Sequence, residues 1–129
     1  MTVLSCNNLD VRIAGIRVVD GLNLDIRPGE FWGLLGPNGI GKTTLLMCLA
    51  GLSEPASGAV KLESRDIGEL PRKMLARHVG MLQQHTVYVF DSSVIQTALT
   101  GRHPHLGYWE RESAEDLKTA HDALEAVDL

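Results

Sequence analysis

The 129 residues of this chain are enough for one domain with a modest hydrophobic core. Hydrophobic residues make up 44% of the chain and the mean hydropathy is +0.01, which excludes a disordered chain and is typical of a globular protein. A net charge of −4 provides no basic surface for nucleic acid, so we expect no nucleic-acid partner. The N-terminus has no signal-peptide pattern, and no apolar run approaches the ~18 residues of a membrane span, so we expect a soluble cytoplasmic protein.

The two cysteines, Cys6 and Cys48, lie far apart in the sequence and show no CxxC spacing. A disulfide between them is possible, but two reduced thiols in a cytosolic protein fit the spacing better.

The first part of the chain predicts strands, a turn, a buried strand and a helix, in that order. Residues Thr2–Ile26 show the alternation of strands, and the turn 27–30 (RPGE) follows, with Pro and Gly at positions that suit a type II turn. The all-apolar run Phe31–Leu35 predicts a short strand buried on both faces. Thr43–Ala50 predicts a helix that ends before Gly51.

The second part of the chain predicts a turn over 53–58, strands over 59–63 and 79–82, and helices over 70–77, 93–100 and 112–127. The last helix has the clearest amphipathic pattern, since apolar residues recur at spacings of three and four at Leu117, Ala120, Leu124 and Val127. Residues 102–111 are predicted to be irregular around Pro104 and Gly107.

The stretch GPNGIGKT, from Gly36 to Thr43, matches the pattern GxxxxGK[ST] in full. It follows a predicted buried strand and opens a predicted helix, which is the context that a phosphate-binding loop requires. Glycines allow main-chain N–H groups to close around an anion, and the helix directs its positive end at the same place. Lys42 is suited to reach the β- and γ-phosphates, and the Thr43 hydroxyl to ligate Mg²⁺. The sequence therefore predicts binding of a nucleoside triphosphate.

Two further stretches, and the residues that directly follow the loop, extend the match. The chain resembles the ATP-binding subunit of ABC transporters at GPNGIGKTTLL, at AGL (residues 50–52) and at VGMLQQ (residues 79–84). The resemblance covers residues 2–129 but only the first half of that family's domain. GRHPHLGYWERES, at 101–113, looks most like importers of iron-siderophores, haem or cobalamin.

The resemblance implies an α/β fold: an incomplete P-loop NTPase core with an N-terminal antiparallel β subdomain. Residues 2–30 would supply the strands of that subdomain, 31–83 the P-loop core, and 84–129 the Q-loop and the start of a helical subdomain.

The resemblance also implies roles for particular residues, with ATP and Mg²⁺ as ligands. Gln84 matches the Q-loop glutamine that meets Mg²⁺ or the attacking water, and Gln83 is the alternative. Ile13 stands where the family has an aromatic residue on the adenine, which puts base selectivity in question. The expected cradle for the phosphates is Gly36, Pro37, Asn38, Gly39, Ile40, Gly41, Lys42, Thr43 and Thr44.

The implied activity is ATP hydrolysis that drives uptake of a metal chelate. The implied partners are transmembrane permease subunits and a second ATP-binding subunit, on the cytoplasmic face of a bacterial inner membrane. The 129 residues contain no LSGG-type signature, no strand ending in Asp-Glu and no switch histidine. We therefore expect these residues alone to bind ATP weakly and to hydrolyse it negligibly.

Two other classes of protein stay open for this chain. Val87–Asp91 resembles an apolar strand capped by an acid, so a small complete P-loop enzyme would use Asp91 as its metal-side carboxylate. A non-catalytic remnant that still docks on a membrane subunit is the third class. The pair His103 and His105 is a poor candidate for a metal site, because Pro104 between them directs the two rings apart.

Overall fold

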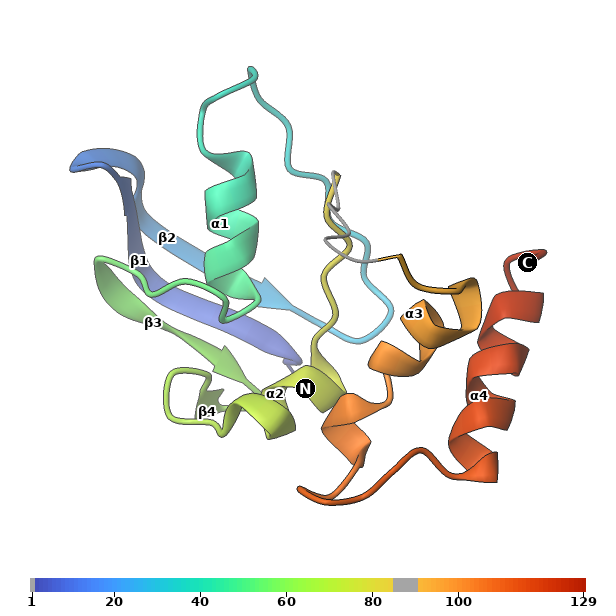
Figure 1. Cartoon of the computed structure of the whole chain (residues 1–129). Coiled ribbons are helices and arrows are strands. Elements are labelled where there is room, and N and C mark those ends of the chain that lie inside the picture. Colours follow the sequence, from blue (N-terminus) through green and yellow to red (C-terminus); the bar gives the residue numbers. More distant parts are fainter. Residues whose placement is uncertain (1, 85–90) are drawn as a thin grey trace. The chain divides into compact units, whose positions relative to one another are not determined.

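A computed structural model describes residues 2–84 and 91–129, and it separates them into two compact units (Figure 1). The first unit ends at Leu75 and the second begins at Ala76. Of the predicted strand Val87–Asp91, only Asp91 belongs to the described residues.

The first unit is built on a four-stranded sheet with the order β2-β1-β3-β4. The strands are β1 (Leu4–Ile13), β2 (Ile16–Ile26), β3 (Ser57–Leu62) and β4 (Arg65–Asp66). Every neighbouring pair is antiparallel. The predictions of strands within 2–26 and over 59–63 are confirmed, and the antiparallel sheet extends beyond the N-terminal segment to include β3 and β4.

A two-residue turn joins β1 to β2. Ala14 and Gly15 have φ of +48° and +83°, as a tight hairpin that follows the twist of its strands requires. Ile13 and Ile16 face each other across the hairpin, next to the turn.

Helix α1 (Lys42–Leu49) packs on β1, the strand between β2 and β3. Its buried side chains are Leu45 and Cys48. The predicted helix is confirmed, and Gly51 (φ +70°) ends it by donating its N–H to the carbonyl of Cys48. The buried hydrophobic side chains of this unit are Cys6, Leu9, Val11, Leu45, Cys48, Val60, Leu62, Ile67 and Leu75.

Both cysteines are free and buried, as the spacing predicted. Burial raises the pKa of both thiols, because a thiolate is poorly solvated in the core. Both cysteines are therefore packing residues of the core.

The apolar run Phe31–Leu35 does not form the predicted buried strand. It has no regular structure, and the exposed fractions of Phe31 and Leu35 are 103% and 93%. The run 79–82 was likewise predicted as a strand and is irregular, with Leu82 exposed. Burial on two faces requires neighbouring strands, and none of the described strands pairs with either run.

The second unit contains α3 (Val94–Thr100), a short 3₁₀ helix η1 (His103–His105) and α4 (Ala114–Glu125), and α3 contacts α4. Helix α2 (Arg72–His78) ends just inside this unit. The three helices predicted over 70–77, 93–100 and 112–127 are confirmed, with ends that shift by one or two residues. The segment predicted to be irregular contains the 3₁₀ turn. None of the helices within the described ranges is long and apolar enough to cross a membrane.

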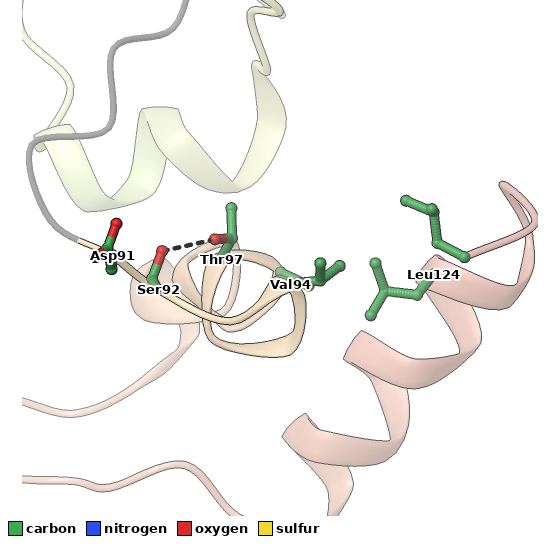
Figure 2. A pocket seen from close by; sticks show the side chains of 7 residues that line it. Asp91, Ser92, Val94, Thr97 and Leu124 are labelled. Carbon is green, nitrogen blue, oxygen red and sulfur yellow. Dashed lines mark hydrogen bonds between the residues drawn. The ribbon is translucent and has the colours of Figure 1, made fainter.

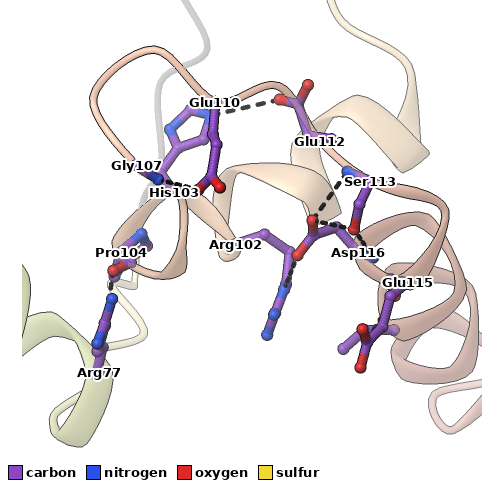
Figure 3. A network of polar contacts seen from close by, with 11 residues as sticks. Arg77, Arg102, His103, Pro104, Gly107, Glu110, Glu112, Ser113, Glu115 and Asp116 are labelled. Carbon is purple, nitrogen blue, oxygen red and sulfur yellow. Dashed lines mark hydrogen bonds and ion pairs between the residues drawn. The ribbon is translucent and has the colours of Figure 1, made fainter.

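A buried carboxylate links the segment after α3 to the start of α4 (Figure 3). Asp116 accepts hydrogen bonds from the Ser113 hydroxyl at 2.7 Å and from the Ser113 N–H at 2.9 Å, which closes a capping box at the start of α4. Its other oxygen accepts from Arg102 Nε at 2.8 Å. The hydrogen bonds from Ser113, followed by the one from Arg102, lower the pKa of Asp116 to about 2.

We predict that Gly58→Ala destabilises the first unit far more than Gly29→Ala. Both glycines have φ of +79°, so both variants carry the same left-handed strain of about 1–2 kcal/mol. A methyl group at Gly29 meets nothing within 4 Å, whereas at Gly58 it lies 2.7 Å from the carbonyl oxygen of Asn7 and closer still to that of Asn8. The backbone clash adds about 1–3 kcal/mol. Urea unfolding followed by circular dichroism measures the difference, and equal losses would contradict the sheet register described here.

We also predict that Asp116 makes the second unit sensitive to acid. A carboxylate with a lowered pKa stabilises the folded state above the ordinary Asp pKa of 3.8, and that contribution disappears as pH falls toward 2. Wild-type protein should therefore lose α3–α4 stability between about pH 4 and pH 2. Asp116→Asn should be less stable than the wild type at pH 7, and it should lose less stability than the wild type between these two pH values. Glu115→Gln, also in the first turn of α4, is the matched control, and an unchanged acid transition in Asp116→Asn would contradict the prediction.

Candidate nucleotide-binding site

The stretch Gly36–Gly41 leads from the exposed apolar run into the first turn of α1. Gly39 and Gly41 have φ of +79° and +105°, which side chains disfavour. Gly41 is the residue that precedes the helix, and its carbonyl accepts the first helical hydrogen bond, from the Leu45 N–H at 2.9 Å. The glycines at these two positions therefore give the loop its curvature.

Strand β2 holds the loop from one side. A methyl group added to Gly41 would lie 2.8 Å from Cβ of Val18, so the Gly41 backbone sits directly on that valine. A cavity of about 180 Å³ lies beside this contact and is lined by Val18, Val19, Leu34, Leu35, Ile40, Gly41, Lys42 and Leu45. The absence of a side chain at Gly41 is thus a packing requirement as well as a conformational one.

Lys42 is bonded to its own loop. Its ammonium donates to the carbonyl oxygens of Gly36 and Pro37, both at 2.7 Å. Within the described residues, Lys42 forms no ion pair with a carboxylate. The positive charge is therefore held over the loop by neutral groups and stays available to an anionic ligand.

The N-terminal end of α1 carries no negative group of its own. No side chain caps it, and no acidic residue lies in its first turn. The first-turn N–H groups and the positive end of the helix dipole are thus not neutralised locally. Together with the Lys42 ammonium, they form a site that suits phosphate oxygens. The Thr43 side chain is exposed beside it, as a hydroxyl ligand to a phosphate-bound cation must be.

The structure brings the predicted loop residues, Gly36 to Thr44, together within the first unit. Ile13 lies in the same unit, at the end of β1, and its side chain is 38% exposed. Gln84 and its alternative Gln83 are exposed and belong to the second unit. Their catalytic role stays a prediction.

Asp91, the acid of the alternative P-loop reading, lines a cavity of about 560 Å³ in the second unit (Figure 2). The other lining residues are uncharged: Ser92, Val94, Thr97, Ala98, Leu124 and Leu129. Ser92 and Thr97 share a hydrogen bond of 3.1 Å. Over the described residues there is no group of three or more His, Cys, Asp or Glu side chains that suits a metal ion, His103 and His105 included. Asp91 and the phosphate loop belong to different units, and the metal-side role of Asp91 stays a prediction.

The model of the family described as ABC transporter matches residues 19–129. The chain therefore belongs to the ABC transporter family, and its fold is that of the family's α/β P-loop ATPase domain, as predicted.

Among its relatives, the phosphonates import ATP-binding protein PhnC of Alcaligenes faecalis is 38% identical over 89% of this chain and 44% of its own length. The hemin import ATP-binding protein HmuV of Pseudomonas aeruginosa is 40% identical over 98% of this chain and 48% of its own length. A solved structure, an inward-facing conformation of a putative metal-chelate type ABC transporter, aligns with a TM-score of 0.74 and 26% identity over 99% of this chain and 45% of that one. The chain thus spans about half the length of the curated relatives that it matches.

Sequence reasoning missed two contributors to the site. Val18 shows no local signal, because its contact with Gly41 depends on how β2 and α1 pack. The carbonyl contacts of Lys42 were not predicted either, although a lysine six residues after the first loop glycine has the length to reach back to it.

We predict that Lys42→Ala weakens binding of Mg·ATP about 10- to 100-fold, the range expected when a charged hydrogen-bond donor is lost. The fold should persist, because the hydrogen-bond partners of Lys42 are exposed carbonyl groups of its own loop. Titrations followed by the amide NMR signals of Gly39 and Gly41 measure the affinity. Lys118→Ala, at an exposed position of α4, is the charge-matched control. Equal affinities of the wild type and Lys42→Ala would rule out the loop as the phosphate site.

Proposed function

We propose that this chain is the ATP-binding component of an ABC importer, in which ATP hydrolysis drives uptake of a substrate of the iron-siderophore, haem or cobalamin type. The observation that carries the proposal is a phosphate-binding loop with an uncompensated lysine at the start of α1, in a chain that belongs to the ABC transporter family. The substrate class draws on the motif at 101–113 and on the hemin importer among the relatives.

The proposed roles follow from the geometry of the loop. The N–H groups of residues 38–44 bind phosphate oxygens, and Lys42 exchanges its two carbonyl partners for the β- and γ-phosphates. Thr43 and Gln84 would hold Mg²⁺, which neutralises charge on the phosphates when it is bound. A glutamine amide positions water without competing for the metal as a carboxylate would, so Gln84 would orient the attacking water.

The proposed partners are transmembrane permease subunits and a second ATP-binding subunit, at the cytoplasmic face of the membrane. In this assignment residues 2–30 supply strands of a β subdomain, 31–83 the nucleotide-binding core, and 84–129 the Q-loop and the first helices of a helical subdomain. The exposed apolar side chains of Tyr108 and Trp109, which stack edge to face, suit a contact with a permease.

Deletion of the gene in its natural host, followed by uptake assays, tests the proposal. Radiolabelled iron-siderophore, haem and cobalamin are tested in turn, and uptake of one of the three should fall at least tenfold. The wild-type gene and an Asp91→Asn variant should restore uptake, whereas Lys42→Ala should not. Asp91→Asn is the informative control, because an enzyme that used this carboxylate for its metal would lose activity.

Three other results would redirect the assignment. Loss of phosphonate uptake alone would keep the importer function and replace the substrate class, in line with the relative PhnC. Failure of Asp91→Asn to complement, in addition to that of Lys42→Ala, would favour the small P-loop enzyme. Unchanged uptake of every substrate in the deletion strain would contradict a role in import.

A further inference from the structure

The turn within the phosphate loop joins an asparagine to a glycine. The Ile40 N–H donates to the Pro37 carbonyl at 3.4 Å, which closes a turn with Asn38 and Gly39 at its centre. The φ of +79° at Gly39 suits the third position of a type II turn, and a Cβ placed there would meet nothing within 4 Å. Both central residues are exposed. The Asn38–Gly39 peptide is therefore accessible to water and free of steric restraint.

The two groups of this peptide that could react with each other are not held by hydrogen bonds. Over residues 2–84 and 91–129, the side-chain amide of Asn38 and the N–H of Gly39 have no hydrogen-bond partner. Attack of the Gly39 nitrogen on Cγ of Asn38 closes a five-membered ring. A side chain on the second residue would hinder this attack, and glycine has none.

Lys42 places a positive charge beside the same turn. Its ammonium donates to the carbonyl oxygens of Gly36 and Pro37, and Pro37 directly precedes Asn38. A nearby cation stabilises the negative charge that develops on an attacking amide nitrogen and on the amide oxygen under attack. The charge that prepares the loop for an anion thus also favours reaction at Asn38.

The remaining asparagines of the sequence have different surroundings. Asn7, Asn8 and Asn23 lie in strands, and each is followed by a residue with a side chain. The Asn8 N–H donates to Oδ1 of Asn23 at 2.9 Å, and Nδ2 of Asn23 donates to the Gly21 carbonyl at 3.0 Å. Reaction at these positions would require the sheet to open, whereas reaction at Asn38 would not.

We propose that Asn38 is a site of spontaneous deamidation, and that the carboxylate formed there closes the phosphate loop to nucleotide. The Gly39 nitrogen gives its proton to hydroxide and bonds to Cγ of Asn38, the bond from Cγ to Nδ2 breaks, and ammonia leaves with a proton taken from water. Water then opens the succinimide ring at either carbonyl, which leaves aspartate or isoaspartate at position 38. Either product sets a negative charge against the phosphates, and isoaspartate also lengthens the main chain by one carbon.

Nucleotide binding and deamidation oppose each other in this scheme, which here rests on the proposed function. There the N–H groups of residues 38–44, that of Gly39 included, donate to phosphate oxygens. An N–H that donates to phosphate must give up that bond before its nitrogen attacks, and the bound loop holds the turn in one conformation. Occupied loops therefore keep Asn38 intact, and empty loops lose it.

The test follows the full 129-residue chain during incubation at mildly alkaline pH. Peptide mapping by mass spectrometry gives the deamidated fraction at each asparagine, and an isoaspartate methyltransferase labels the isoaspartate product. Asn38 should react at least about tenfold faster than Asn7, Asn8 or Asn23, because asparagine is labile where the backbone is free. Mg·ATP at about ten times its dissociation constant should slow the reaction about tenfold, since the free protein alone reacts. Equal rates at the four asparagines would overturn the inference and leave the proposed function standing.

The consequence for binding is measured on the reacted protein. The deamidated fraction, separated by ion exchange, should bind Mg·ATP at least about tenfold more weakly than the unreacted fraction, as followed by the amide NMR signal of Gly41. Asn38→Gln is the matched control, because it keeps the amide but would have to close a six-membered ring, and its affinity should be the same before and after incubation. Equal affinities of the two wild-type fractions would overturn the closing of the loop. Fresh protein that binds no Mg·ATP would overturn the proposed function, while the rates at the four asparagines would still decide the site of modification.

A second variant separates the open turn from the sequence alone. Asp20→Asn places an asparagine before Gly21, whose N–H donates to Oδ1 of Asp10 at 2.8 Å. Because this N–H is held, position 20 of the variant should deamidate at least about threefold more slowly than Asn38 in the same chain. Reaction at position 20 as fast as at Asn38 would show that the free N–H in the loop confers nothing and would overturn the inference.

Discussion

The packing of α1 on β1 is the interaction on which the candidate site depends. The helix buries Leu45 and Cys48, and the strand on which it packs buries Cys6, Leu9 and Val11. Each fully buried side chain of this size contributes about 1.5–3 kcal/mol, so the contact is strong enough to fix where the helix starts. Because the loop ends where α1 begins, the hydrophobic core determines where the positive end of the helix and the lysine charge are presented.

The loop combines features that each suit an anionic ligand, for different physical reasons. Gly39 and Gly41 supply the backbone curvature, and Gly41 also permits the contact with Val18. Lys42 supplies a full charge, and its two carbonyl partners keep it over the loop before a ligand arrives. Preorganisation of this kind limits the conformational entropy that binding removes, so a loop of exposed residues can still bind an anion specifically.

Local pattern predicted the helices, the strands within 2–26 and the loop, because short-range geometry determines them. GxxxxGK[ST] specifies backbone conformations within eight residues, and Ser93 and Ser113 cap their helices through contacts three residues away. The contact of Val18 with Gly41 and the environment of Asp91 required the structure, since each depends on residues distant in the sequence. The buried strand predicted at Phe31–Leu35 was wrong for the same reason: apolar composition indicates a preference for burial and does not supply the neighbours.

That exposed run has a consequence for the loop that it precedes. On one side, the loop is anchored through Gly41 to α1 and to Val18 of β2. On the other side, Gly36 follows directly on Leu35, which is almost fully exposed and pairs with none of the described strands. Strands that covered the run would restrain Gly36 and its carbonyl, one of the two groups that position Lys42. Such restraint would limit the conformational entropy that the loop loses when it binds an anion, because Lys42 would already be held in place.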